Sequence, residues 1–438
     1  MAQKIKIEKL VEGGQGLGYS ENQAFFVWNA LTGEEVEVEI LNKRKGIYEA
    51  RTVNIIQPSA HRIEARENHF LSCSPWQIMD WEYENEQKIA IAVEDYRRIA
   101  KLIEEDIKIL DIKILSDDKI FGYRNKMEFS FIEKDGKISL AFFSRGQKKK
   151  YPINSCELAN PVINETAKKI LTWINENHLT ERNLKSLIVR SNKKGETIAG
   201  LFIKDKLNNL CRDKACLVPT GKIIGFSLYY STHKSPASVI TEVLYQEGQD
   251  FLIEEISGKK FKYGINSFFQ VNISVFEIAL NDIKKAISEN NSKNSSNSIN
   301  SHLIDFYSGV GAIGLNVGAN TLVESNAEAV DFAKENIALN GIVGAHCHAP
   351  MPAEKALDFI QKDSIIIFDP PRAGLHQKVI ERILEVKPQK IIYLSCNIAT
   401  HARDIGLLKD TYNIKSIKLY NFFPRTPHIE GLCILELK

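Results

Sequence analysis

The chain has 438 residues, of which 44% are hydrophobic and 26% are charged, and its formal net charge at pH 7 is +2. This composition is typical of a soluble globular protein, and the length predicts two or three domains. No apolar run approaches the roughly 20 residues of a membrane helix, and the N-terminus lacks the apolar core of a secretion signal. The seven cysteines are odd in number and scattered, which argues against a disulfide framework. We therefore expect a cytoplasmic protein with no membrane partner.

Residues 1–57 form short predicted strands with glycine-containing turns, and EEVEVEIL alternates with period two. Closely spaced strands of this kind predict a small OB-like β-barrel. Lys43, Arg44 and Lys45 make a basic turn within it. Such a turn is either a solvated hairpin tip or a contact for a nucleic-acid backbone, and the sequence leaves both open.

Residues 58–262 contain a helical stretch at about 82–110 and several strands, a combination that predicts a central α+β domain. We expect the helical stretch to pack on the catalytic domain. In residues 263–438, an Asn- and Ser-rich stretch at 289–302 predicts a flexible insert. After it, apolar strands alternate with helices, from HLIDFYSG to KIIYLSCN. This alternation predicts an α/β, doubly wound, Rossmann-like domain.

Gly309, Gly311 and Gly314 satisfy G-x-G-x-x-G between a predicted strand and a helix. The pattern indicates either a nucleotide-binding loop or a tight turn without a ligand. Glu324 ends the next strand, where it can accept hydrogen bonds from a ribose diol. It follows Gly309 by 15 positions, fewer than the roughly 20 usual for dinucleotide enzymes, which favours an S-adenosylmethionine pocket over NAD.

Two further strand ends carry reactive groups. Asp369, in FDPPRAG, follows a buried strand at the edge where open α/β sheets bind ligands, although two prolines can also simply stiffen a strand exit. Cys396, in YLSCN, leaves another strand at the same edge. A buried cysteine is usually a small core residue, but polar neighbours, including Arg403, favour a thiolate nucleophile here. Glu430 precedes the last strand and is either a general base for that nucleophile or a solvated loop carboxylate.

SFFQVN, DFYSGVG, FDPPRAG, LSCN and PHIEG occur in the order and approximate spacing of the uracil-5 RNA methyltransferase family. The N-terminal barrel resembles the TRAM domain of that family, and GYRNKMEFSF resembles the start of its central domain. The resemblance therefore covers nearly the whole chain. It implies an S-adenosylmethionine-dependent enzyme that makes 5-methyluridine in structured RNA, with ribosomal RNA favoured over transfer RNA, and we expect a monomer.

The resemblance also assigns roles to individual residues. It implies that Cys396 adds to C6 of uracil and that Glu430 removes the C5 proton. The implied cofactor and active-site residues are Gln270, Tyr307, Gly309, Gly311, Glu324 and Asp369, and Arg124 resembles a residue near the RNA. The barrel and its basic turn, with Lys43, Arg44 and Lys45, are expected to hold the RNA backbone.

The chain departs from the family at a [4Fe–4S] site that many members build from C-x5-C-x2-C and a fourth cysteine. Cys73 matches the second ligand and Cys156 the fourth, whereas Trp76 stands in the third position and no cysteine precedes. Two thiolates are too few for a cluster that needs four cysteines. We expect no iron–sulfur cluster, with Trp76 filling that space. Neither CRDKAC at 211–216 nor HCH at 346–348 has typical zinc spacing, so the sequence predicts no metal ligands.

Three alternatives stay open from the sequence. A cytosine-5 RNA methyltransferase also uses cysteine addition, although Glu430 favours uracil. A nicotinamide-dependent oxidoreductase could use the glycine motif, and a non-catalytic RNA-binding protein would not depend on Cys396.

Overall fold

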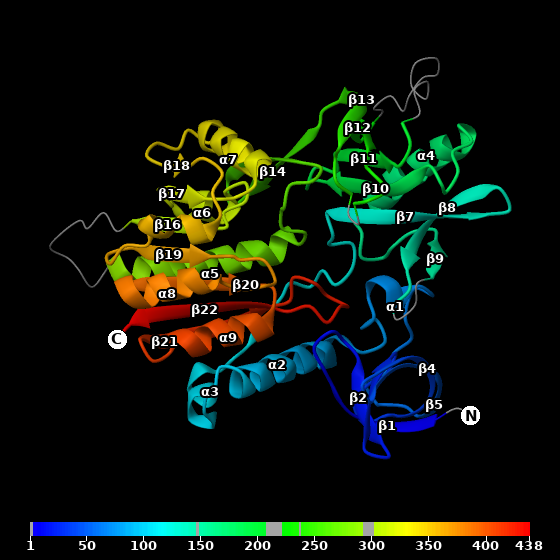
Figure 1. Cartoon of the computed structure of the whole chain (residues 1–438), viewed down its shortest axis with the longest axis horizontal. Helices are drawn as coiled ribbons and strands as arrows, with labels where there is room; N and C mark the ends of the chain where they lie inside the picture. Colours follow the sequence, from blue (N-terminus) through cyan, green and yellow to red (C-terminus); the bar gives the residue numbers. More distant parts are fainter. Residues whose placement is uncertain (1–2, 146–148, 207–220, 236–237, 292–301) are drawn as a thin grey trace. The chain divides into compact units, whose positions relative to one another are not determined.

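The computed structural model describes residues 3–145, 149–206, 221–235, 238–291 and 302–438 (Figure 1). Two compact units divide the chain. One takes in 1–84, 119–252 and 424–427, and the other 85–118, 253–423 and 428–438. Cys211 and Cys216 lie outside the described residues. Among those described, no helix combines the length and apolarity needed to cross a membrane.

The first unit contains a closed barrel with strand order β1-β2-β3-β5-β4, which confirms the predicted N-terminal barrel (Figure 1). Its strands are β1 (Gln3–Leu10), β2 (Gly16–Ser20), β3 (Gln23–Trp28), β4 (Glu35–Arg44) and β5 (Ile47–Gln57). Because side chains alternate along a strand, Ile5 and Ile7 of β1 and Val36 and Val38 of β4 point into one apolar core.

The same unit contains a seven-stranded sheet of order β13-β12-β11-β10-β7-β8-β9. Its strands are β7 (Lys126–Lys134), β8 (Lys137–Phe143), β9 (Lys150–Ile153), β10 (Leu184–Ser191), β11 (Thr197–Ile203), β12 (Ile223–Tyr230) and β13 (Glu242–Gly248). Helix α4 (Pro161–Glu176) begins with a proline after the N-cap Asn160, and its buried face packs on the sheet core. The short helix α1 (Phe70–Cys73) precedes this region in the chain. A separate pair, β14 (Phe251–Ile256) and β15 (Lys259–Gly264), follows it.

The second unit is built on an eight-stranded sheet of order β18-β17-β16-β19-β20-β22-β21-β6. Its strands are β6 (Ile114–Leu115), β16 (Leu303–Phe306), β17 (Thr321–Val323), β18 (His346–Cys347), β19 (Ile365–Phe368), β20 (Lys390–Ser395), β21 (Tyr412–Tyr420) and β22 (Glu430–Leu437). The strands from β18 to β20 are parallel, and β22 runs antiparallel between β20 and β21. The α/β prediction is therefore confirmed.

The helices of this unit are α2 (Trp81–Arg98), whose first residues fall in the first unit, α3 (Glu104–Leu110), α5 (Ile273–Asn291), α6 (Ala312–Val317), α7 (Ala327–Leu339), α8 (Gln377–Val386) and α9 (Ile398–Leu408). Two 3-10 turns, η1 (Ala353–Lys355) and η2 (Leu357–Phe359), precede β19. The flexible insert expected from residue 289 was placed too early, because α5 is still helical there and polar residues such as Glu289 are compatible with a helix. Residues 292–301 of that expected insert lie outside the described part of the chain.

Candidate active site

Four parallel strands of the second unit end at one edge of the sheet. β16, β17 and β19 are followed by the glycine turn, Glu324 and Asp369, and β20 is followed by Cys396. Since the chain crosses from β16 to β17 on one side and returns to β19 on the other, the strand order reverses between β16 and β19. Ligands of open α/β sheets bind at such a switch point, outside the carboxyl ends of the strands.

The glycine turn adopts left-handed backbone conformations at Tyr307, Gly309 and Gly311, with φ of 62°, 54° and 85°. A Cβ atom added at Gly309 would meet nothing within 4 Å. The Gly309 N–H donates to Glu324 Oε2 at 2.9 Å. The turn therefore exposes backbone to open space beside a carboxylate, which is the arrangement that a nucleoside with a ribose diol requires.

Two buried aspartates, Asp305 and Asp369, lie near this turn. Asp305 in β16 accepts a hydrogen bond from the Gly314 N–H at 2.8 Å, which anchors the start of α6 to the strand. Burial raises the pKa of Asp305 to about 8, an effect that the Gly314 hydrogen bond opposes. Burial also raises the pKa of Asp369 to about 7. A cationic ligand at this edge would favour the ionised form of both carboxyl groups.

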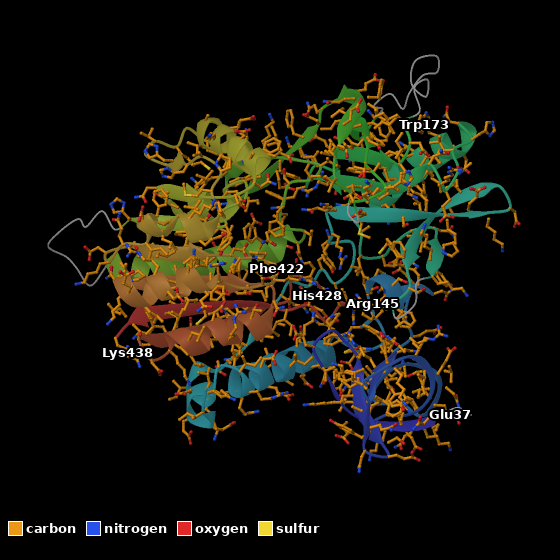
Figure 2. The ribbon with its side chains drawn as sticks, in the orientation of Figure 1. Glu37, Arg145, Trp173, Phe422, His428 and Lys438 are labelled. Atoms are coloured by element: carbon orange, nitrogen blue, oxygen red, sulfur yellow. The ribbon has the colours of Figure 1, made fainter. Side chains whose placement is uncertain are left out.

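Cys396 and Glu430 are brought together by strand pairing. Ser395 of β20 pairs with Gly431 of β22 in antiparallel register, so the residue that follows Ser395 lies beside the residue that precedes Gly431. The connection from β21 to Glu430 passes through Phe422 and His428, which are labelled in Figure 2. Glu430 is buried, with 4% of its surface exposed, whereas Cys396 is half-buried.

Burial of Cys396 opposes the thiolate form that its polar neighbours were expected to favour. The pKa of Cys396 is raised to about 12, chiefly by burial and then by the charges of Glu430 and Asp369, whereas Arg372 lowers it. Burial likewise raises the pKa of Glu430 well above its usual range, with Asp369 adding to the effect and Arg372 opposing it. Asp369 thus raises the pKa of both Cys396 and Glu430, and Arg372 lowers the pKa of both.

Arg372, not Arg403, is the cation that acts on this group. Arg403 forms an ion pair with Asp404 at 2.7 Å and donates to the carbonyl of Ala373. Asp404 in turn accepts from Tyr393 and from the Leu375 N–H. This network ties α9 to the loop after Asp369. Arg372 was not among the residues expected from the sequence, although it stands within the FDPPRAG motif.

His401 of α9 packs against the end of β20 that precedes Cys396. Its Nδ1 lies 2.9 Å from the Tyr96 hydroxyl and its Nε2 lies 3.2 Å from the Tyr393 carbonyl. Burial lowers the pKa of His401 to about 3, so the ring is neutral, with the proton on Nε2 and Nδ1 accepting from Tyr96. A Cβ atom at Gly431 would come within 2.9 Å of His401 Nδ1. The glycine after Glu430 is therefore required by close packing.

The remaining predicted residues occupy three places. Gln270 is buried in the segment before α5, and burial raises the pKa of Tyr307, next to the glycine turn, to about 12. Lys43, Arg44 and Lys45 are all exposed at the β4–β5 hairpin. Arg124 is only partly exposed, and its charge acts on Cys73 and Cys156 of the first unit.

The model of the tRNA (uracil-5-)-methyltransferase family matches residues 91–438. The chain belongs to this family. An uncharacterized RNA methyltransferase of Caldanaerobacter subterraneus is 32% identical over 99% of this chain and 98% of its own length. A similarly named protein of Fusobacterium nucleatum is 30% identical over 99% and 96%.

Among solved structures, the tRNA (uracil-54, C5)-methyltransferase of Pyrococcus abyssi, in complex with S-adenosyl-L-homocysteine, has a TM-score of 0.75. It is 22% identical and the alignment covers 99% of this chain and 100% of that one, which shows a shared fold. Family membership makes the protein an RNA methyltransferase that uses S-adenosylmethionine, as predicted. It sets aside the oxidoreductase, the cytosine-5 enzyme and the non-catalytic RNA-binding protein.

Proposed function

We propose that the protein converts a specific uridine of structured RNA to 5-methyluridine through a covalent adduct with Cys396. The observation that carries this proposal is the pairing of Ser395 with Gly431, which sets a thiol beside a buried carboxyl group at the cofactor edge. Uracil C5 is a weak nucleophile, and addition of a thiolate to C6 divides one difficult step into easier ones.

In the proposed reaction the Cys396 sulfur bonds to C6 of uracil, and the electron pair of the C5–C6 double bond moves to make C5 nucleophilic. S-adenosylmethionine, when bound, supplies an electrophilic methyl group on a positively charged sulfur. After C5 is methylated, Glu430 takes the C5 proton, the C5–C6 double bond re-forms and the Cys396 sulfur leaves. Glu324 and the amides around Gly309 would hold the nucleoside part of the cofactor, beside Asp369.

The raised pKa values of the free site fit this sequence of events. Cys396 and Glu430 share their surroundings with Asp369, so a positive charge placed at this edge lowers the pKa of all three groups. Arg372 already acts in that direction on Cys396 and Glu430. The nucleophile would thus ionise only when the cofactor site is filled, which limits side reactions of the thiol.

Ribosomal RNA is the favoured substrate class in this proposal. Transfer RNA is the second candidate, because the matched family carries it in its name. A paired uracil is inaccessible, so the target base must leave its stack, at an expense of a few kcal/mol. Mapping 5-methyluridine in ribosomal and transfer RNA from cells with and without the protein identifies the class and the nucleotide.

The covalent step is tested with RNA that contains 5-fluorouridine, because fluorine cannot leave C5 as a proton does. We expect the wild-type protein to form a stable protein–RNA complex that survives denaturation. Cys396→Ala should form none, and Cys433→Ala, at a core cysteine of β22, should behave as wild type. An adduct that persists in Cys396→Ala would refute the assignment of the nucleophile.

A further inference from the structure

Four side chains of the first unit that can bind a metal lie close together. In the sequence they are far from the proposed methyltransferase residues. They are Glu67, His69, Cys73 and Cys156, and their donor atoms all lie within 4.8 Å of one another. Glu67, His69 and Cys73 come from the segment that contains α1, whereas Cys156 follows β9. The sequence pointed to the two cysteines alone and predicted no metal. The carboxylate and the imidazole join them only in the folded chain.

The donor set does not fit a [4Fe–4S] cluster. Glu67 stands six positions before Cys73, where the family pattern has its first cysteine, and Trp76 stands at the third. Trp76 is buried and its indole N–H donates to the Gly14 carbonyl at 3.2 Å. Two thiols with one carboxylate and one imidazole cannot supply the four thiolates that such a cluster requires.

We propose instead that Glu67, His69, Cys73 and Cys156 bind a single zinc ion. Zinc prefers four ligands in a tetrahedron, with sulfur, nitrogen and oxygen donors at about 2.0–2.3 Å, so its donors lie roughly 3.3–3.8 Å apart. With all donor atoms within 4.8 Å of one another, binding would draw the widest pair together by at most about 1.5 Å. Soft thiolates with an imidazole select zinc over magnesium or calcium. Because four protein ligands leave no open position, the site is structural and not catalytic.

The histidine faces the other proposed ligands. His69 is 8% exposed, and its Nε2 lies 3.2 Å from Glu67 Oε1. The ring also interacts with the Cys156 side chain. The imidazole is therefore already turned toward a carboxylate and a thiol that a metal ion would bind with it.

The groups around the four ligands hold them in place. Gln77 Nε2 donates to Glu67 Oε2 at 2.9 Å, and the Glu157 N–H donates to Glu67 Oε1 at 2.7 Å. Asn164 of α4 exchanges two hydrogen bonds with the backbone of Cys156. Outer contacts of this kind orient metal ligands.

The local charge is also balanced. Two thiolates and one carboxylate around a divalent ion leave a net charge of −1. The guanidinium of Arg124 is close enough to interact with both Cys73 and Cys156, so it brings the site to neutrality. An ion held there would join the segment after the barrel to the turn before α4, which is a stabilising role.

The proposal is tested by measuring metal and sulfide in the full-length protein purified without added metal. We expect one zinc per chain, and loss of it in His69→Ala and in Cys156→Ser. Cys347→Ser, at a half-buried cysteine of β18, is the matched control and should retain its zinc. Gln77→Leu keeps all four ligands and should weaken metal binding by about tenfold or more.

Replacement of zinc by Co²⁺ in the wild-type protein gives a readout that needs no variant. We expect the near-ultraviolet band of a thiolate–cobalt bond and the intense visible bands of a tetrahedral ion, at one equivalent. A protein that binds neither zinc nor cobalt would overturn the proposal. So would four irons with four sulfides per chain, or a disulfide between Cys73 and Cys156 in protein isolated under reducing conditions.

Discussion

Cys396 and Glu430 lie side by side at one sheet edge, because β22 pairs antiparallel with β20. Burial raises the pKa of the Cys396 thiol most, and the charge of Glu430 is the next largest cause. The proposed base therefore influences the proposed nucleophile before any substrate binds. Because the thiol and the carboxyl group both resist ionisation, Cys396 is expected to be unreactive in the free enzyme.

Substitution of Glu430 by Gln should separate the two halves of the proposed reaction. The amide cannot accept the C5 proton, so we expect methyl transfer to proceed once and release of Cys396 to slow by at least about a hundredfold. Denaturing gels with ordinary uridine-containing RNA and labelled cofactor should show an accumulated covalent complex. Normal turnover in Glu430→Gln would remove this residue from the mechanism.

Alkylation of Cys396 should be slow in the ligand-free protein. With its pKa raised from 9.0 to about 12, the thiolate fraction near neutral pH is about a thousandfold below that of an ordinary cysteine, and the rate should rise steeply as the pH increases. Arg372→Gln removes a favourable cation and should slow alkylation further. Peptide mapping after iodoacetamide treatment follows Cys396 individually, and equal rates in the two proteins would contradict the role given to Arg372.

Asp305 should make the free protein less stable as the pH rises. Its folded pKa of about 8 lies above the ordinary value of 3.8, so the folded state holds a proton that the unfolded state releases. Its contribution is complete below about pH 4 and is lost as the pH rises to about 8, on the order of 1 kcal/mol for each unit of the shift.

Asp305→Asn should therefore flatten the change of Tm between those pH values, and should raise Tm at neutral pH. Asp331→Asn, at an exposed position of α7, is the control and should follow the wild-type curve. Parallel curves for Asp305→Asn and wild type would show that Asp305 is ionised in the folded protein.

The exposed hairpin tip of the barrel should contribute to RNA affinity without affecting the chemical step. Replacement of Lys43, Arg44 and Lys45 by Gln should weaken binding and lower the salt dependence of log K by roughly 0.7 for each phosphate that is no longer neutralised. The rate of a single turnover at saturating RNA should not change. Lys108→Gln, at an exposed lysine of α3, provides the comparison for removal of one charge. An unchanged salt slope in the triple variant would mean that the tip is simply solvated.

Features that depend on local pattern could be predicted from the sequence. Closely spaced strands in residues 1–57, with period-two alternation in EEVEVEIL, predicted the barrel. Apolar runs before Gly309, Asp369 and Cys396 predicted parallel strands with the ligand-binding groups at their carboxyl ends. These signals are readable because side-chain direction and turn chemistry repeat over a few residues. The order of the same motifs was enough to indicate the family.

The effects of distant residues on one another could not be predicted in the same way, because they depend on how the chain folds. The raised pKa values of Cys396 and Glu430 arise chiefly from burial, which no local sequence pattern reveals. Arg372, not Arg403, is the cation that lowers these pKa values, because Arg403 is paired with Asp404. The convergence of Glu67 and His69 with Cys156 joins positions almost ninety residues apart. Burial and long-range packing produce these environments, and they exist only after the chain has folded.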